Sequence, residues 1–355
     1  MIFKFNHQER LDYTSRNIIL WIILSLLLVL LFIADIFTGS VNIPVDEVWR
    51  IITGQSTDHP EYLTIIYRFR LPKALTAVFA GFALSVSGLQ MQTVFKNPLA
   101  GPYVLGISAG ASLGVAVVIM GISSFALVSQ LGVIGNWIIV IAAWIGSGLI
   151  LFLILMVSVR VKDIMTILIL GIMFGSATTA IVNILQYFSN ESMLKAFVVW
   201  TMGSLGGVSI SQLKVLIPGI FLGLVISFLS VKILNAMLVG ENYAKSMGLN
   251  VGLSRFLIFF STSLLAGSIT AFCGPIGFIG IAVPHIARMI FKTANHQILL
   301  PGTLILGGII LLFSDIISQI PGKENTVPIN SITALVGIPI VIWIIIRNKK
   351  LSNLG

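Results

Sequence analysis

The sequence predicts an all-α polytopic membrane protein with about ten transmembrane helices, which form a single permease-like membrane domain over residues 1–355. Hydrophobic residues make up 57% of the chain, and charged residues make up 9%, against about 25% in soluble proteins. The mean hydropathy is +1.06. A soluble domain must cover its surface with polar groups, which this composition does not supply. Most of the surface is therefore expected to face lipid or other helices.

Apolar runs of about 20 residues, long enough to cross a hydrocarbon core of about 30 Å, alternate with charged or Pro- and Gly-rich breaks. The first run is long for a signal peptide and lacks a small-residue cleavage site, so we expect it to remain as a spanning helix. The third and eighth runs are the least regular, because they are Gly-rich or contain proline. The ten predicted spans are 18–37, 75–91, 106–122, 135–159, 165–185, 213–234, 256–273, 276–290, 299–320 and 332–346.

The Lys and Arg residues between these spans predict the topology. With ten spans, most of the 21 Lys and Arg residues fall on the side of the two termini, and the positive-inside bias makes that side cytoplasmic. Residues 1–17 then form a cytoplasmic tail, 38–73 an external loop and 235–255 a cytoplasmic loop. Because the net charge of +9 follows the topology, we expect no nucleic-acid partner.

The residue inventory does not favour an enzyme. The histidines are too scattered for an HExxH motif or another paired ligand spacing, so no metal site and no catalytic residue are predicted. His285, which follows Pro284, is expected to be a hydrogen-bonded structural residue. The GxxxxGK[ST] motif does not occur, so we expect the chain to bind no cofactor and any ATP to be hydrolysed by another subunit.

A basic cluster in the segment YRFRLPKAL lies on the predicted external side, against the positive-inside bias. It consists of Arg68, Arg70 and Lys73. One interpretation is a docking patch for an acidic partner, because charge complementarity sets the orientation and rate of an encounter. The alternative is anchoring to lipid phosphates beside the helix.

The cytoplasmic segment MLVGENYAKSMGLNVGLSR predicts a short amphipathic helix, because apolar and polar residues interleave after Gly240 and Glu241. Such a helix can seat in a groove on a partner, and small residues such as Ala244 and Gly248 allow close approach. A helix that lies on the inner leaflet is the alternative.

Gly and Pro are dense in several segments where they are expected to break helices near membrane depth. Broken helices are tolerated where they line a water-filled path or pack on protein, and close packing alone accounts for part of these glycines. The segment 195–208 is too short to span the membrane and predicts a half-helix or re-entrant piece. The candidate pathway and break residues are Asn97, Pro98, Trp200, Gly203, Gly206, Gly274, Pro275 and Pro284.

Asp315 is a carboxylate well inside an apolar run, and intramembrane acids are costly enough to be functional candidates. A proton relay needs several such groups, whereas the other spans supply almost none. We therefore favour a hydrogen bond from Asp315 to a neighbouring helix over a relay.

Several segments together resemble the FecCD family of ABC importer permeases, which take up iron-siderophore complexes, haem and cobalamin. The resemblance runs nearly end to end, in the family's order and spacing. It is carried by RLPKALTAVFAGFALSVSGLQMQ (70–92), NPLAGPYVLGISAGASLG (97–114), GENYAKSMGLNV (240–251), GPIGFIGIAVPHIAR (274–288), LLPGTLILGG, SDIIS and TALVGIPIVIW.

The resemblance implies a type II importer subunit with a fold like that of the cobalamin permease. In that family the ten-helix subunit pairs with a copy of itself around a central pathway. Its partners are two cytoplasmic ATP-binding subunits, which contact short coupling helices, and an external substrate-binding protein. The implied location is the bacterial cytoplasmic (inner) membrane, with both termini in the cytoplasm.

The resemblance also implies roles for individual residues. Arg70 and Lys73 match the family's outward-facing basic motif, which meets acidic residues of the binding protein. The positions matching the ATPase-coupling motif are Gly240, Glu241, Ala244 and Gly248, and the pathway is expected along the fifth span, the segment 200–206 and the tenth span.

The chain departs from the family pattern after the ninth span. Gln319 stands where the family often has a basic residue, Asn330 replaces a glycine, and the spacing from Glu324 to Pro328 is stretched. Lys323 is the candidate to supply the missing external charge, and with Glu324 it completes the predicted docking set.

The function predicted from these features is the permease subunit of an ATP-driven importer for an iron chelate, haem or cobalamin. An ion-coupled secondary transporter is the alternative. Such a carrier would depend on Asp315 and run without an ATPase, whereas an importer depends on ATP. The sequence does not specify which chelate is carried.

Overall fold

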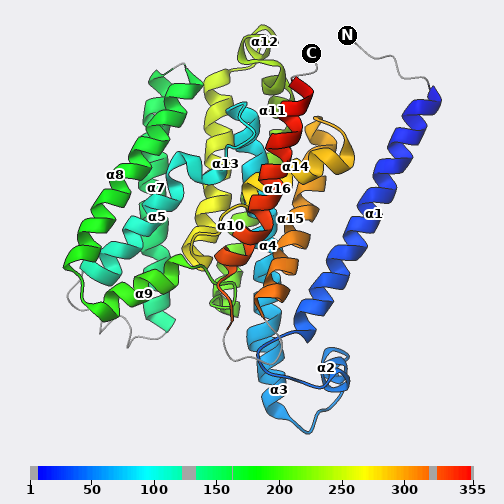
Figure 1. Cartoon of the computed structure of the whole chain (residues 1–355), viewed down its shortest axis with the longest axis vertical. Coiled ribbons are helices and arrows are strands. Elements are labelled where there is room, and N and C mark those ends of the chain that lie inside the picture. Colours follow the sequence, from blue (N-terminus) through cyan, green and yellow to red (C-terminus); the bar gives the residue numbers. More distant parts are fainter. Residues whose placement is uncertain (1–6, 122–132, 162, 320–325, 353–355) are drawn as a thin grey trace.

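The computed structural model describes residues 7–121, 133–161, 163–319 and 326–352, and this part of the chain consists of helices and their connections. Most helices run up and down through one bundle (Figure 1). Helices α2 (Val45–Ile52) and α3 (Pro60–Ile65) lie at one end, here named the α3 end. Helix α12 (Glu241–Ser246) lies at the other, the α12 end, where α1 (His7–Phe37) begins and α16 (Ile329–Ser352) finishes.

The remaining elements are long helices, shorter helices and short helical turns. They are the π-turn η1 (Ile66–Arg70), α4 (Leu71–Val94), the 3₁₀ turn η2 (Pro102–Leu105), α5 (Ile107–Ala116), the π-turn η3 (Val117–Gly121), α7 (Val133–Arg160), α8 (Ile164–Phe188), α9 (Glu191–Thr201), α10 (Ile210–Leu229), α11 (Val231–Val239), α13 (Val251–Cys273), α14 (Ile279–Phe291) and α15 (His296–Ser318).

All ten predicted spans have a helical counterpart, and the all-α membrane fold is confirmed. Within the described residues, seven helices are long and apolar enough to cross a membrane. The third, eighth and tenth predicted spans correspond to shorter apolar helices, Ile107–Gly121, Ile279–Phe291 and Ile329–Trp343. Two of these three are the spans that Gly and Pro had already marked as irregular.

The second span begins earlier than predicted. A continuous helical segment runs from Pro60 to Val94, so the predicted external loop contains α2, α3 and η1. Pro72 cannot donate a backbone hydrogen bond, and a proline normally disrupts the turn before it. The π-turn absorbs this disruption, because the Leu71 N–H bonds the carbonyl of Ile66, five residues back.

Two other boundaries differ from the prediction. The sixth span stops at Leu229, and after Ser230 the chain continues as the separate helix α11. The predicted half-helix is helical only to Thr201, where α9 ends.

Pro284 was predicted to break a helix, and this prediction is wrong. Helix α14 passes through Pro284 without interruption. Proline leaves the carbonyl four residues earlier, that of Gly280, without its helical donor. This oxygen faces the Cα of Gly88 on α4, so closely that a Cβ at Gly88 would lie 1.8 Å from it. A Cα–H···O contact of this kind partly replaces the missing hydrogen bond.

Helix α4 occupies the centre of the bundle and contacts α13, α14 and α15. The segments Pro60–Val94 and Val251–Cys273 are the most buried of the long spans, whereas Arg16–Phe37 and α8 are the least buried. Small residues let the backbones approach, as membrane helices require. The central helix therefore serves as the frame against which the more exposed helices are placed.

A buried polar cluster fixes three of these central helices. Gln90 of α4 donates to Ser227 of α10 at 3.0 Å, and its side-chain oxygen accepts from Thr262 of α13 at 2.9 Å. The hydroxyls of Ser227 and Ser261 are 2.8 Å apart. Because the side-chain oxygen and nitrogen of Gln90 both have partners, the cluster sets the register of the helices rather than forming an open polar path.

Candidate functional site

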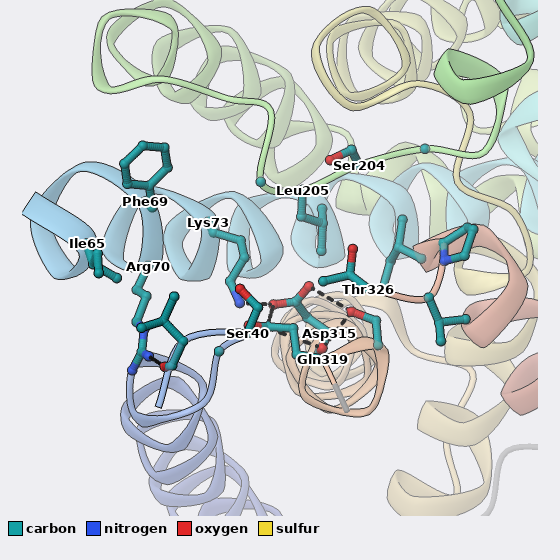
Figure 2. Close-up of a pocket in the computed structure, with 18 residues that line it drawn as sticks. Ser40, Ile65, Phe69, Arg70, Lys73, Ser204, Leu205, Asp315, Gln319 and Thr326 are labelled. Carbon is teal, nitrogen blue, oxygen red and sulfur yellow. Dashed lines mark hydrogen bonds and ion pairs between the residues drawn. The ribbon is translucent and has the colours of Figure 1, made fainter. Parts of the chain in front are cut away.

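A cavity of about 420 Å³ opens at the α3 end of the bundle. Its wall comes from five separate parts of the chain: the turn after α1, the segment from the end of α3 through η1 to the start of α4, the loop after α9, the end of α15 and the segment before α16 (Figure 2). Polar groups on this wall include Arg70, Lys73, Ser204, Asp315, Gln319 and Thr326. The cavity therefore combines the predicted basic motif, the intramembrane acid and the breaks around Gly203 and Gly206 in one place.

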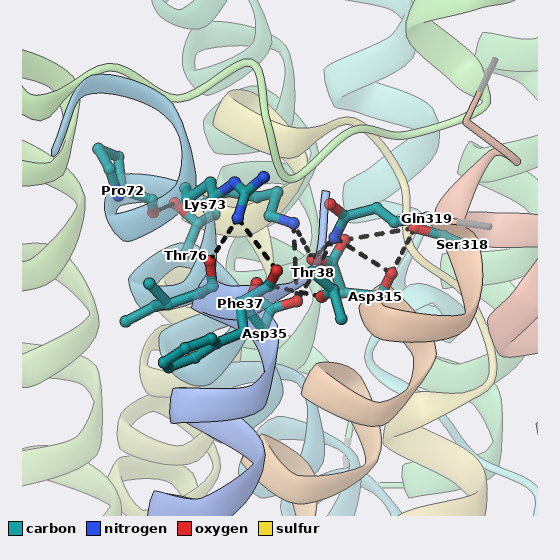
Figure 3. Close-up of polar contacts among 11 residues, drawn as sticks. Asp35, Phe37, Thr38, Pro72, Lys73, Thr76, Asp315, Ser318 and Gln319 are labelled. Atoms are coloured by element: carbon teal, nitrogen blue, oxygen red, sulfur yellow. Dashed lines mark hydrogen bonds and ion pairs between the residues drawn. The ribbon is translucent and has the colours of Figure 1, made fainter. Parts of the chain in front are cut away.

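Two carboxylates and one ammonium group meet beside this cavity. Lys73 Nζ lies 2.8 Å from Asp315 Oδ2 and 3.6 Å from Asp35 Oδ1. Gln319 Nε2 donates to Asp315 Oδ2 at 2.9 Å and to Asp35 Oδ1 at 3.4 Å. Figure 3 shows these side chains converging from α1, α4 and α15. We name this group the Asp35–Lys73–Asp315 cluster.

The cluster is buried, since Asp35 is 0% exposed and Asp315 is 4% exposed. Charges in such a place persist only when partners compensate their lost hydration. Lys73 supplies one positive charge, which lies closer to Asp315 than to Asp35. Asp315 thus reaches a neighbouring helix, and it does so through an ion pair rather than a simple hydrogen bond.

Arg70 lies inside the bundle, which corrects the prediction of an outward-facing side chain. It is 4% exposed, and its guanidinium donates to the carbonyls of Ile36, Phe37 and Val41. The last carbonyls of α1 have no partner within the helix, and Arg70 satisfies them. Of the predicted basic cluster, Arg68 is exposed, and the Lys73 side chain keeps 12% exposure.

The predicted helix breaks on either side of the cavity contact one another. Gly274 adopts a φ of +73°, and a Cβ there would lie 2.4 Å from the carbonyl oxygen of Trp200. The N–H of Ser204 donates to the carbonyl of Cys273 at 2.8 Å. Pro275 lies against Gly203, whose own φ is +74°. The end of α9 is therefore docked on the end of α13.

Asn330, near the start of α16, contacts the segments that follow both α9 and α13. Its side-chain oxygen accepts from the N–H of Gly277 at 3.0 Å, and its own N–H donates to the carbonyl of Met202 at 3.4 Å. The residue that departs from the family pattern thus joins the start of α16 to both breaks. Gly203 and Gly206 line the cavity, whereas Asn97 and Pro98 lie in the connection after α4.

Asn97 and Pro98 belong to a separate structural turn. The side-chain oxygen of Asn97 accepts from the N–H of Leu99 at 2.9 Å. The carbonyl of Pro98 lies 2.8 Å from Nε2 of His285. His285 is therefore the hydrogen-bonded structural residue that the sequence predicted, and it ties the turn to α14.

The predicted coupling residues gather on α12, as the amphipathic pattern indicated. Ala244 is 1% exposed and faces the protein, and the flanking glycines Gly240 and Gly248 have φ values of +150° and +82°. Glu241 begins the helix and forms an ion pair with Arg255, with Oε1 2.6 Å from Nη2. The exposed side of α12 includes Tyr243 and Lys245.

Two predicted docking residues, Lys323 and Glu324, lie outside the described residues. Among the residues that are described, no group of three or more His, Cys, Asp or Glu side chains is placed to hold a metal ion.

Comparison with known proteins decides the family. The sequence profile of the FecCD transport family matches residues 26–347, which is most of the chain. The chain belongs to the FecCD transport family.

This FecCD chain is similar along its length to several transport permeases. It is 34% identical over 327 residues to the vitamin B12 import system permease protein BtuC of Klebsiella pneumoniae subsp. pneumoniae, covering 92% of this chain and 93% of that protein. It is 33% identical over 328 residues to the hemin transport system permease protein HmuU of Yersinia pestis, covering 92% and 95%. It is also 33% identical over 328 residues to the uncharacterized ABC transporter permease protein YvrB of Bacillus subtilis, covering 90% of each.

A solved structure has the same fold. A chain from a metal-chelate type ABC transporter in an inward-facing conformation superposes with a TM-score of 0.75 at 26% sequence identity, covering 92% of this FecCD chain and 99% of that chain. The chain is therefore a multi-pass membrane permease of the ABC transport class rather than an enzyme.

Sequence reasoning missed parts of both sites. The sequence pattern indicates a role for neither Asp35, which lies near the end of its apolar run, nor Arg255, which lies at the end of the predicted cytoplasmic loop. Asp35 is, however, an acid in the last turn of a strongly apolar run, and intramembrane acids seek a cation. Matching it with Asp315 and the nearest basic motif would have indicated the cluster at Lys73.

Proposed function

We propose that the chain is the membrane-spanning subunit of an ATP-driven importer that carries a metal chelate, haem or cobalamin. The observation that carries this proposal is the family match over residues 26–347, together with relatives named for vitamin B12 import and hemin transport. In this proposal two copies of the chain form one pathway. Two cytoplasmic ATP-binding subunits supply the energy, and an external binding protein delivers the substrate.

The proposed orientation places the α3 end outside and the α12 end in the cytoplasm of a bacterial inner membrane. Most basic residues of the connections and both chain ends then lie inside, as the positive-inside bias requires. The cavity at the α3 end faces the delivered substrate. The exposed side of α12 faces the ATP-binding subunits.

The chemistry of the cavity suits a substrate that arrives already chelated. A bare metal ion needs converging oxygen or imidazole ligands, and the described residues hold no such group. The carboxylates nearest the cavity are already paired with Lys73.

The proposal is tested with the purified complex of this chain, its ATP-binding subunit and its binding protein in liposomes. ATP hydrolysis is measured with a ferric siderophore, haem or cobalamin added in turn to the binding protein. One of the three should stimulate hydrolysis and accumulate inside the liposomes. Accumulation of substrate by the isolated chain, without the ATP-binding subunit, would instead establish the ion-coupled alternative.

A prediction about the docking face follows from the exposure of Arg68 beside the buried Arg70. Arg68→Glu should weaken the binding protein's affinity about tenfold at low salt, because a like charge then faces its acidic surface. The loss should shrink at high salt, since screening shortens the range of exposed charges. Surface plasmon resonance at two salt concentrations measures both effects.

The control for this experiment is Arg160→Glu, the same charge change at an exposed position of the α12 end. It should leave the affinity unchanged. An unchanged affinity for Arg68→Glu as well would assign Arg68 to lipid anchoring.

A further inference from the structure

Arg255 is a charged residue that is almost completely buried near the α12 end. It lies in the first turns of α13 and is 3% exposed. Its guanidinium binds Glu241 of α12 through two nitrogens, with Nε 2.9 Å from Oε1 and Nη2 2.7 Å from Oε2. This two-point geometry fixes the relative orientation of the two side chains, which a single contact would not do.

The same guanidinium reaches the connection between α7 and α8. Arg255 Nη1 donates to the carbonyl oxygen of Val161 at 3.3 Å. Two residues later Asp163 caps the N-terminus of α8, and its carboxylate accepts from the N–H groups of Met165 and Thr166 at 3.3 and 2.9 Å. One side chain thus contacts both α12 and the segment that starts α8.

The electrostatics of this junction keep the start of α8 negatively charged. The hydroxyl and N–H of Thr166 and the N–H of Met165 lower the pKa of the Asp163 carboxyl, and the positive charge of Arg255 adds to that effect. An ionised carboxylate at this place stabilises the helix N-terminus. The positive Arg255 is therefore attracted to the start of α8 as well as to Glu241.

Helix α8 is suited to move as a unit. It is among the least buried of the long spans, so fewer side chains hold it against the core than hold α4 or α13. Its 25 residues extend about 38 Å as a helix, and its far end leads through Ser189 into α9 and the loop that lines the cavity. A displacement at its first turn is thereby carried to the α3 end.

We propose that Arg255 is a positioning residue that transmits displacement of α12 to the first turn of α8, and through α8 to the cavity. The inference rests on the proposed function, in which the ATP-binding subunits press on α12. The Glu241 contact receives the displacement, and the Val161 contact passes it on, aided by the electrostatic attraction between Arg255 and Asp163. If Arg255 served only to hold α12 against α13, its contact with Glu241 would be sufficient.

The test measures movement of α8 in the assembled complex, without any transported substrate. Spin labels are placed on cysteines at Met165 of α8 and Ile19 of α1, both exposed, in a chain in which the buried Cys273 is replaced by serine. The distance between the labels is measured by pulsed electron resonance without nucleotide and after trapping with ATP and vanadate. The shift is compared at equal amounts of trapped nucleotide.

In the parent chain the distance should shift on trapping, and in Arg255→Gln and Glu241→Gln that shift should be lost. Arg160→Gln, which removes an exposed arginine one residue before Val161, should keep it. The charge-exchanged pair Glu241→Arg with Arg255→Glu restores the ion pair but not the bond to Val161, so the shift should stay lost. If Arg255 only held α12 against α13, the charge exchange would instead restore the shift in label distance.

A normal shift in Arg255→Gln, an absent shift in the parent, or full rescue by the charge exchange would each overturn the inference. Failure of the parent chain to form an ATP-hydrolysing complex would instead contradict the proposed function. The two failures are distinguished because ATP hydrolysis by the complex is measured before any label distance.

Discussion

Lys73→Met will lower the stability of the folded chain by about 3–5 kcal/mol, the usual cost of removing one partner of a buried ion pair. The substitution leaves Asp35 and Asp315 facing each other without a cation, although both are buried. The side-chain amide of Gln319 donates hydrogen bonds to both carboxylates but carries no positive charge. The midpoint of thermal unfolding in detergent, followed by loss of monodisperse protein, measures the effect.

The control and the rescue for this prediction come from the same end of the molecule. Arg68→Gln removes an exposed positive charge one turn away and should change the midpoint little, because exposed charges contribute little to stability. Combining Lys73→Met with Asp35→Asn and Asp315→Asn should recover most of the loss, since the buried charges are then all removed. An unfolding midpoint for Lys73→Met equal to that of Arg68→Gln would show that Lys73 does not stabilise the buried carboxylates.

Gly88→Ala will be the most damaging of the small substitutions in the core. A Cβ at this position would lie 1.8 Å from the carbonyl oxygen of Gly280, which is backbone and cannot rotate away. Helices α4 and α14 must then separate, and overpacking of this kind typically costs about 1–3 kcal/mol or more. The Cα–H···O contact to the carbonyl freed by Pro284 is lost as well.

Gly148→Ala is the matched control, because a Cβ on that glycine of α7 meets no atom within 4 Å. Its unfolding midpoint should equal or slightly exceed that of the parent, since alanine favours helix over glycine. The yield of folded protein after detergent extraction gives a second measure. Similar midpoints for the two variants would show that α4 and α14 are not in backbone contact.

Much of the architecture could be predicted because the bilayer imposes a simple length rule. A segment in hydrocarbon must satisfy its own backbone hydrogen bonds and be apolar for about 20 residues. All ten spans could be located in this way. The boundaries were less predictable where local geometry intervened, as at the π-turn before Pro72 and at Ser230.

Whether an individual side chain is exposed or buried could not be predicted in the same way. Arg68 and Arg70 differ by two positions, and one is exposed while the other is buried against the end of α1. The π-turn contains both residues and changes the rotation of the helix there. Two positions along a helix place side chains on roughly opposite faces, so the sequence separates Arg68 from Arg70 but does not indicate which of them contacts the end of α1.

The sequence by itself determined the class of the protein and the number and order of its apolar segments, because hydropathy acts locally along the chain. Only the tertiary structure decided that Asp35 and Asp315 share Lys73 and that Arg255 joins Glu241 to the start of α8. Asp35 and Gln319 are 284 positions apart in the chain and yet in contact. Such pairs depend on which helices pack together, and that is set by the close approach of small residues rather than by the pattern of any one segment.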